Sequence, residues 1–360
     1  MLASLIATPK KRIIIGGALA LLLIGGIALA LVAAGGEEAA PPTTTTSTVP
    51  EPTTTTTPPP VAPLTGVGGD HLERTKRPAL VVKIDNVEPK ARPQAGINEA
   101  DVVYEERVEG SVTRLIAIFH STDAAPVGPV RSGRTSDIAV FTPLHRPYFA
   151  WSGANNTFAQ RIRAAAMIDV GYDRATDQYY RDRGRPGTSN LMIRSTDHIM
   201  RLPAEGSSPP PPLFTYRSPN NPEPAHWQPV GGVHVNYGGS AGSAPVDYRW
   251  NGTGWARDQK GTPHVDAGGV QVAPANVIVH FAGYAPTDVG DQFGQPIPEA
   301  QLVGDGPAWV FTAGGVVEGH WYKPTLDAVP TYLDVDGNPI GLTPGRTWVA
   351  LAPPGGASLI

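Results

Sequence analysis

Three short apolar runs with charged ends constrain the fold of this chain more than any other feature. They are Leu80–Ile84, Val102–Tyr104 and Leu115–Phe119. Short apolar runs bounded by turn residues are typical of buried β-strands. Acids and arginines stand at the ends of each run, so the sequence predicts a sheet whose strand ends carry a polar site.

The chain before these runs predicts export from the cytoplasm. Lys10, Lys11 and Arg12 precede Ile13–Ala34, a run of 22 uncharged residues. Such a run is long enough to cross about 30 Å of hydrocarbon as a helix. The basic residues predict that 1–12 stay inside the cell and that the rest lies outside. We expect an uncleaved single-pass anchor; the alternative is a cleaved signal peptide and a secreted protein.

Residues 35–70 are rich in Thr and Pro, a composition that predicts a disordered tether between membrane and globular part. The sequence contains no cysteine. It therefore has no disulfide, no thiolate metal site and no cysteine for a lipid anchor. We expect the chain to attach to the membrane through Ile13–Ala34 alone.

The globular part is predicted to hold two domains. The fold class is an α/β (α+β) domain over 71–205, then a Pro-rich connector over 206–228 and a mainly β domain over 229–355. Helices are predicted over Thr157–Ile168 and from Asn190 to about Leu202. The stretch His71–Arg217 holds 20 basic and 16 acidic residues, whereas the part from Ser218 onward holds 5 and 12.

The polar residues at the strand ends form the candidate ligand site, which consists of Asp85, Asn86, Arg92, Asp101, Glu105, Arg114, Arg131 and Arg134. If the runs pair in one sheet, Asp85 and Asp101 are expected near the Arg131/Arg134 pair. Carboxylates there would suit a divalent cation, and arginines would suit an oxyanion. Gly133 is expected to let the backbone approach a phosphate. The alternative is a structural network of ion pairs that closes the strand ends.

A second metal candidate is the segment Pro263-His264-Val265-Asp266. On a strand, His264 and Asp266 would point to the same face. The candidate ligands of a divalent cation, the one cofactor considered, are thus Asp85, Asp101, His264 and Asp266. A hydrogen-bonded surface pair is the alternative for the last two.

Several common motifs are absent from the sequence. It has no Gly-Lys-Ser/Thr phosphate loop, no dinucleotide fingerprint and no His-Glu-x-x-His. These absences weigh against the common nucleotide-driven and redox classes and against the zinc hydrolases with that motif. No nucleic-acid partner is expected.

The segments VVKIDN, ARPQAGINEADVVYEERVEGSVTRLIAIFHS and VGPVRSGR, followed later by GWARDQKGTPHVDAGGVQV and GLTPGRTWVALAP, carry a resemblance that runs from about Arg77 to Pro353. In them the chain resembles the YerB-like lipoprotein family of bacteria, which bears a domain-of-unknown-function label. The resemblance implies two family domains on an exported, membrane-attached protein, and it supplies no reaction. The chain departs from the lipoprotein members because it lacks the lipidated cysteine.

The strand ends are also similar, more loosely, to those of the LytR-CpsA-Psr phosphotransferases. That likeness implies a metal held by Asp85 and Asp101, and a pyrophosphate held by Arg92, Arg114, Arg131 and Arg134. We therefore expect an extracytoplasmic binding or scaffolding module of the cell envelope. The alternative is a metal-dependent phosphotransferase or hydrolase acting on a (poly)prenyl pyrophosphate or another envelope phosphate, so whether the protein is an enzyme stays open.

Overall fold

The computed structural model describes residues 60–87, 89–218, 220–238, 245–291 and 293–360. The segment Thr57–Ile360 forms one compact unit. The predicted anchor Ile13–Ala34 lies outside the described residues, as does most of the predicted tether. Within the described residues, no helix has the length and apolar character needed to cross a membrane.

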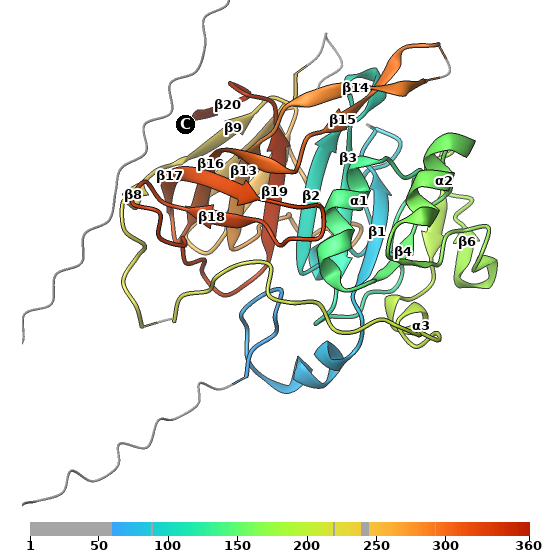
Figure 1. The fold of residues 1–360 in the computed structure, drawn as a ribbon, viewed down its shortest axis with the longest axis horizontal. Helices are drawn as coiled ribbons and strands as arrows, with labels where there is room; N and C mark the ends of the chain where they lie inside the picture. The colour runs from blue at the N-terminus through green and yellow to red at the C-terminus, as the bar shows by residue number, and fades with distance from the viewer. Residues whose placement is uncertain (1–59, 88, 219, 239–244, 292) are drawn as a thin grey trace, which may run out of the picture. The chain divides into compact units, whose positions relative to one another are not determined.

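An 11-stranded mixed sheet is the centre of this unit (Figure 1). Its order is β18-β17-β16-β13-β19-β2-β3-β1-β4-β5, and β8 pairs with β17. The strands are β1 (Leu80–Asp85), β2 (Val102–Arg107), β3 (Thr113–Phe119), β4 (Tyr148–Ala150), β5 (Ile168–Asp169), β8 (Gln228–Pro229), β13 (Asn276–Phe281), β16 (Gly304–Thr312), β17 (Gly315–Lys323), β18 (Thr331–Leu333) and β19 (Thr347–Ala352). The three apolar runs of the sequence are β1, β2 and β3, as predicted.

Both halves of the chain contribute to this sheet. Strand β19 from the C-terminal half pairs in parallel with β2 from the N-terminal half, with Thr347 opposite Val102. The Pro-rich connector between the halves packs against the same unit, because Leu213 and Phe214 are buried in it. The two halves thus share one hydrogen-bonded sheet.

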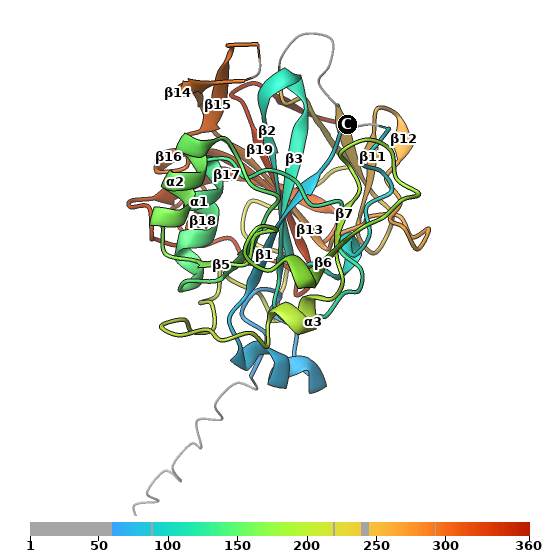
Figure 2. The ribbon, with the colours of Figure 1, turned by 90° about the vertical axis from the view of Figure 1, so that its right-hand side faces the viewer.

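Two layers cover the faces of the central sheet. One face packs on a five-stranded sheet of order β12-β11-β10-β9-β20. Its strands are β9 (Gly232–Val235), β10 (Val246–Trp250), β11 (Trp255–Gln259), β12 (Thr262–Pro263) and β20 (Ala357–Leu359). The other face packs on helices α1 (Ser136–Phe141) and α2 (Asn156–Ala164). Figure 2 shows the central strands between the helices on one side and β11 and β12 on the other.

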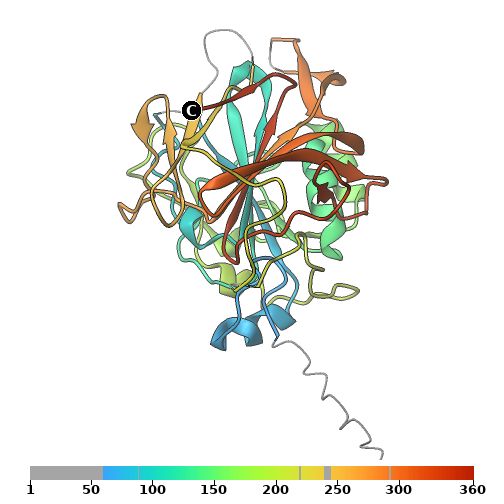
Figure 3. The ribbon, with the colours of Figure 1, turned by 90° about the vertical axis from the view of Figure 1, so that its left-hand side faces the viewer.

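This layering explains why the central strands lack polar alternation. Every residue of β1, β3, β13 and β19 is buried, because each strand is covered on both faces. Figure 3 views the molecule from the side of the C-terminal strands, drawn in orange and red.

Smaller elements complete the unit. They are the hairpin β6 (Tyr179–Arg181) with β7 (Leu191–Ile193), the hairpin β14 (Tyr284–Gly290) with β15 (Pro296–Ala300), helix α3 (Thr196–Ile199), and the 3₁₀ turns η1 (Asp70–Lys76), η2 (Ile97–Glu99), η3 (Glu109–Ser111), η4 (Thr142–Leu144) and η5 (Thr176–Gln178).

Two helix predictions were wrong in their extent. Helix α2 ends at Ala164, because Ile168 pairs with Tyr148 and draws the following residues into the sheet. The second predicted helix begins as strand β7, which pairs with β6, and only Thr196–Ile199 is helical. In both places tertiary pairing overrides the local helical pattern.

Candidate functional site

The predicted site region lies at the C-terminal ends of two parallel strands, β1 and β4. Strand β1 ends at Asp85, and the chain leaves β4 through residues 151–155 to enter α2. The loop Arg131–Arg134 packs between them. The Arg131 amide donates to the Lys83 carbonyl at 2.8 Å, and the Gly133 amide donates to the Gly153 carbonyl at 3.0 Å. Open α/β sheets commonly bind ligands at such strand ends.

Three arginines and two acids meet here, and we call them the arginine cluster: Asp85, Glu109, Arg114, Arg131 and Arg134. Glu109 accepts a hydrogen bond from Arg134 Nε at 2.9 Å and one from Arg114 Nη2 at 3.2 Å. Arg114 Nη1 also donates to the Ser132 carbonyl at 2.8 Å. Arg131 Nε faces Asp85 Oδ2 at 3.4 Å. The structure thus brings together four of the eight predicted site residues, Asp85, Arg114, Arg131 and Arg134, and adds Glu109.

Positive charge exceeds negative charge within the arginine cluster. Three guanidinium groups face two carboxylates, which leaves a formal charge of +1 when all are ionised. Burial, followed by the neighbouring Arg134, lowers the pKa of Arg114 to about 10. Burial would raise the pKa of Glu109, but Arg134 and Arg114 together lower it. The Nε atoms of Arg114 and Arg131 are buried and have no hydrogen-bond partner among the described residues.

Gly133 has a different role from the predicted one. A Cβ atom at this position would lie 3.0 Å from Ile162 Cδ1 and 3.0 Å from Trp151 Cε3. Its missing side chain therefore lets the loop pack closely on Trp151 and α2, rather than admitting a ligand to the backbone.

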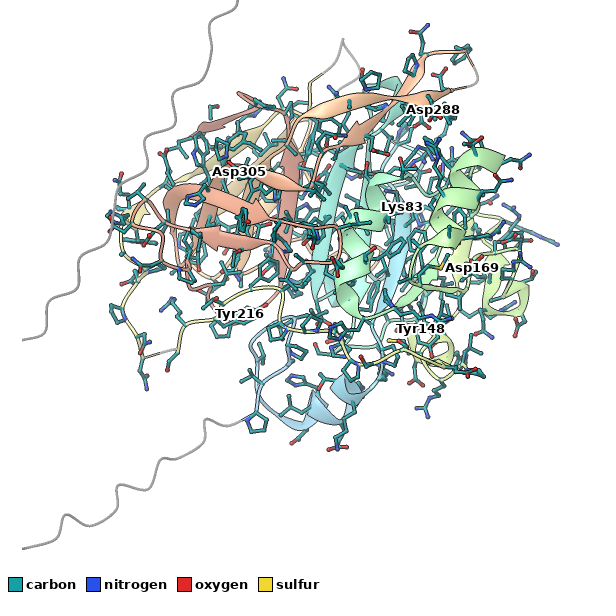
Figure 4. All side chains as sticks on the ribbon, in the orientation of Figure 1. Lys83, Tyr148, Asp169, Tyr216, Asp288 and Asp305 are labelled. Atoms are coloured by element: carbon teal, nitrogen blue, oxygen red, sulfur yellow. The ribbon has the colours of Figure 1, made fainter. Side chains whose placement is uncertain are left out.

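A second charged group, which the sequence did not predict, lies beside the arginine cluster on the same face of the sheet. Lys83, labelled in Figure 4, donates to Asp137 Oδ1 at 2.6 Å and also bonds to Glu106. All three side chains are fully buried. Burial raises the pKa of Glu106, Lys83 lowers it, and Asp137 raises it further. The Arg134 amide donates to Asp137 Oδ2 at 2.7 Å and so connects the two groups.

Glu105 points to the opposite face of the sheet, because successive strand residues alternate. There it accepts two hydrogen bonds from Arg257 Nη2, at 2.9 and 2.8 Å. Asn86 joins this group, since its amide donates to Thr113 Oγ1 at 2.8 Å and to Gln259 Oε1 at 3.1 Å. All of these side chains are buried. Glu105 and Asn86 therefore belong to a structural network of ion pairs and hydrogen bonds, which was the alternative to a ligand site.

The expected convergence of Asp101 with Asp85 was wrong. Asp85 pairs with Arg114, whereas Val102 pairs with Ile118, four positions further along β3. At about 3.3 Å per residue the two acids lie at opposite ends of the strands, more than about 13 Å apart. Asp101 instead accepts a hydrogen bond from the Ser121 amide at 2.7 Å, and burial raises its pKa.

His264 and Asp266 do not form the expected pair. Both ring nitrogens of His264 are engaged, Nδ1 by Arg257 and Nε2 with Gln94 Oε1 at 2.8 Å. Burial, then Arg257, holds the pKa of His264 well below its usual range. Asp266 accepts hydrogen bonds from the amides of Gly268 and Val270, at 2.9 and 3.0 Å. This arrangement leaves the pair no shared site for a metal.

Arg92 also lies apart from the arginine cluster. Its Nη2 donates to the Pro263 carbonyl at 3.1 Å, beside a cleft of about 540 Å³ that Lys260 and Thr262 also line. Within the described ranges, a single group of three side chains has ligand atoms close enough to hold a metal ion: His226, Asp334 and Asp336. None of these three was predicted, and none belongs to the arginine cluster.

Comparison with known proteins identifies the relatives of this chain. Residues 64–206 match the N-terminal domain model of a protein of unknown function, DUF3048, and residues 233–349 match its C-terminal domain model. The Bacillus subtilis protein described as "Putative lipoprotein YerB" is 28% identical over 300 residues, which cover 81% of this chain and 86% of that protein. The crystal structure of Bacillus subtilis YerB superposes with a TM-score of 0.70 at 25% identity, covering 83% of this chain and 99% of that one. The predicted resemblance is confirmed, and the chain belongs to the YerB-like DUF3048 family.

Proposed function

We propose that this chain is a binding module of the cell envelope that captures an oxyanion, a phosphate or carboxylate group, at the arginine cluster. One observation carries the proposal: three guanidinium groups meet only two carboxylates at the C-terminal ends of β1 and β4. With the adjoining Lys83, Glu106 and Asp137 the whole face is formally neutral, so the preference for an anionic ligand depends on the guanidinium group that reaches solvent.

Arg131 is the residue that would contact the ligand first. Its side chain is 27% exposed, whereas those of Arg114 and Arg134 are 6% and 8% exposed. The two buried arginines are fixed by Glu109 and by loop carbonyls, and they add positive potential behind Arg131. A planar guanidinium suits two-point binding of phosphate or carboxylate.

Helix α2 supports the same ligand chemistry. It has nine residues and starts directly after the loop that bonds to Gly133. The N-terminal end of a helix carries partial positive charge, which favours an anion nearby; in α2 the Phe158 amide already donates to Asn155 Oδ1 at 2.9 Å. The helix end and the guanidinium groups both contribute positive potential that favours an anion.

The enzymatic alternative has less support. A metal-dependent phosphotransferase of the expected kind needs Asp85 and Asp101 to share one cation, and the register of β1, β2 and β3 separates them. Binding without group transfer requires only the arginines, so we favour it.

We further propose that the module faces the outside of the membrane. The Bacillus subtilis relative is described as a lipoprotein. This chain has no cysteine to carry a lipid, and the apolar segment Ile13–Ala34 is the feature that can replace it. Mass spectrometry of the mature N-terminus tests the anchor. A mature chain that starts near Gly35 would show that the segment is cleaved and would refute the uncleaved anchor.

Calorimetric titration of the full chain in mild detergent with inorganic pyrophosphate tests the binding site. We expect binding that weakens as salt is added, since the contacts are ionic. The variant Arg131→Ala should bind at least about tenfold more weakly, because it removes a charge-assisted hydrogen bond worth about 1.5–3 kcal/mol.

The matched control is Arg249→Ala, which removes an exposed arginine on β10, in the other sheet. It should bind pyrophosphate as tightly as the parent protein. Absence of pyrophosphate binding by the parent would refute the proposal for a phosphate ligand, and equal affinities for Arg131→Ala and Arg249→Ala would refute the arginine cluster as the binding site.

A further inference from the structure

Two adjoining cavities lie beneath the Pro-rich connector, apart from the arginine cluster. The outer cavity has a volume of about 180 Å³ and apolar walls, which include Leu213, Phe214, Val329, Pro330, Ile340 and Leu342. The inner cavity has about 10 Å³ of free space, room for one water-sized group. Leu213, Pro330 and Tyr332 line both cavities, so the two are neighbours. The inner one adds three polar side chains, those of Tyr104, His280 and Lys323.

His280 lines the inner cavity and has an unsatisfied ring nitrogen. The residue is 2% exposed, and its Nε2 has no hydrogen-bond partner within the described part of the chain. Its Nδ1 lies 3.1 Å from the Tyr332 hydroxyl, and its ring stacks on Trp321 with centroids 4.2 Å apart. Burial lowers the pKa of His280 to about 3, so the ring is neutral near pH 7. When Tyr332 donates to Nδ1, the ring proton lies on Nε2 and can be donated to a ligand oxygen.

Lys323 supplies a cation at the same place. It is 2% exposed, and its Nζ donates to the Leu326 carbonyl at 2.8 Å and to the Ala328 carbonyl. Burial lowers its pKa to about 8, while Asp327 acts in the opposite direction. Among the ion pairs formed by the described residues, none includes Lys323. A nearly buried ammonium group without a carboxylate partner is favourable for an anionic ligand group.

We propose that these cavities bind a small carboxylic acid with one aromatic ring. The ring would fill the outer cavity, and one carboxylate oxygen would enter the inner cavity and accept hydrogen bonds from Lys323 and His280. The size is suitable, because an apolar protein cavity of about 150 Å³ is known to bind benzene. This site shares no residue with the arginine cluster, so the two proposals succeed or fail independently.

The test uses the full chain in mild detergent, with phenylacetate and its uncharged analogue 2-phenylethanol as probes. Ligand-observed NMR, corrected with empty micelles, gives the affinity of each. The parent protein should prefer phenylacetate. The variant Lys323→Met should lower the phenylacetate affinity about tenfold or more and leave that of 2-phenylethanol within about twofold, because only the anion loses a charge-assisted hydrogen bond.

A second variant tests the outer cavity without touching Lys323. Val329→Trp, a partly buried position in its wall, should fill the space and abolish binding of both probes. Val335→Trp, at an exposed position, is the matched control and should bind as the parent does. The proposal is overturned if phenylacetate does not bind, if the parent shows no preference for it over 2-phenylethanol, or if Val329→Trp binds like Val335→Trp.

Discussion

The ion pair between Glu105 and Arg257 joins the central sheet to the five-stranded sheet, and replacing Arg257 tests how much it stabilises the fold. Both side chains are fully buried. Arg257 donates twice to Glu105, at 2.9 and 2.8 Å, and once to Gln259 Oε1 at 3.0 Å. Glu105 and two tyrosines raise the pKa of Arg257 despite its burial, which alone would lower it. The arginine is therefore charged at every usable pH.

The variant Arg257→Met keeps the apolar stem and removes the charge. Among the described residues, Glu105 then keeps two donors, Thr113 Oγ1 at 2.8 Å and Asn86 Nδ2 at 3.3 Å. Breaking a buried ion pair on one side costs about 3–5 kcal/mol, because the other charge stays in the low-dielectric interior. That is a large part of the total stability of about 5–15 kcal/mol that is usual for a domain.

Urea denaturation of the full chain, followed by tryptophan fluorescence, measures this loss. Trp255 and Trp348 are buried, and Trp348 lies 5.0 Å from the Arg257 guanidinium, so they report on this interface. The control Arg249→Met, at an exposed position on β10, should change the free energy of unfolding by less than about 1 kcal/mol.

A second substitution separates the charge from the lost packing. In Arg257→Met/Glu105→Gln the remaining side chain is uncharged, so stability should partly return. A loss below about 1 kcal/mol for Arg257→Met, or no recovery with Glu105→Gln, would refute the assignment of a stabilising buried pair.

Two further predictions concern the face that carries the arginine cluster. Burial raises the pKa of Glu106 above its usual 4.5, so the folded parent protein should lose stability as the pH rises above that value. The variant Glu106→Gln lacks this titrating group. The midpoint of its urea denaturation should therefore change less between about pH 5 and pH 8 than that of the parent. An equal change of the urea midpoint with pH in the two proteins would contradict this prediction. Gly133→Ala should lower stability by about 1–3 kcal/mol, since its Cβ would crowd Trp151 and Ile162 at 3.0 Å. Gly283→Ala, where nothing lies within 4 Å, is the control, and equal melting temperatures for both variants would contradict the crowding.

The sequence by itself determined the strands around the site and their local pairing. The runs at β1, β2 and β3 are too short and too apolar for surface helices, and the turn at Glu109-Gly110 fixes β2 against β3. The concentration of arginines at Arg131 and Arg134 was also visible, because charged residues directly after an apolar run mark a strand end. The family resemblance followed from these segments together with the later segments GWARDQKGTPHVDAGGVQV and GLTPGRTWVALAP.

Only the tertiary structure decided which charges meet. Lys83 looks in sequence like a chance interruption of an apolar run, yet it faces Asp137, 54 positions away. Glu105 and Glu106 are neighbours in sequence, but they belong to different networks because they point to opposite faces of the sheet. Asp85 and Asp101 both border strands, and the strand direction puts them at opposite ends. The sequence pattern shows that side chains alternate along a strand. The face of the sheet that each side chain points to, the direction of the strand and its neighbouring strand depend on the strand order, which is set by pairing across the whole chain.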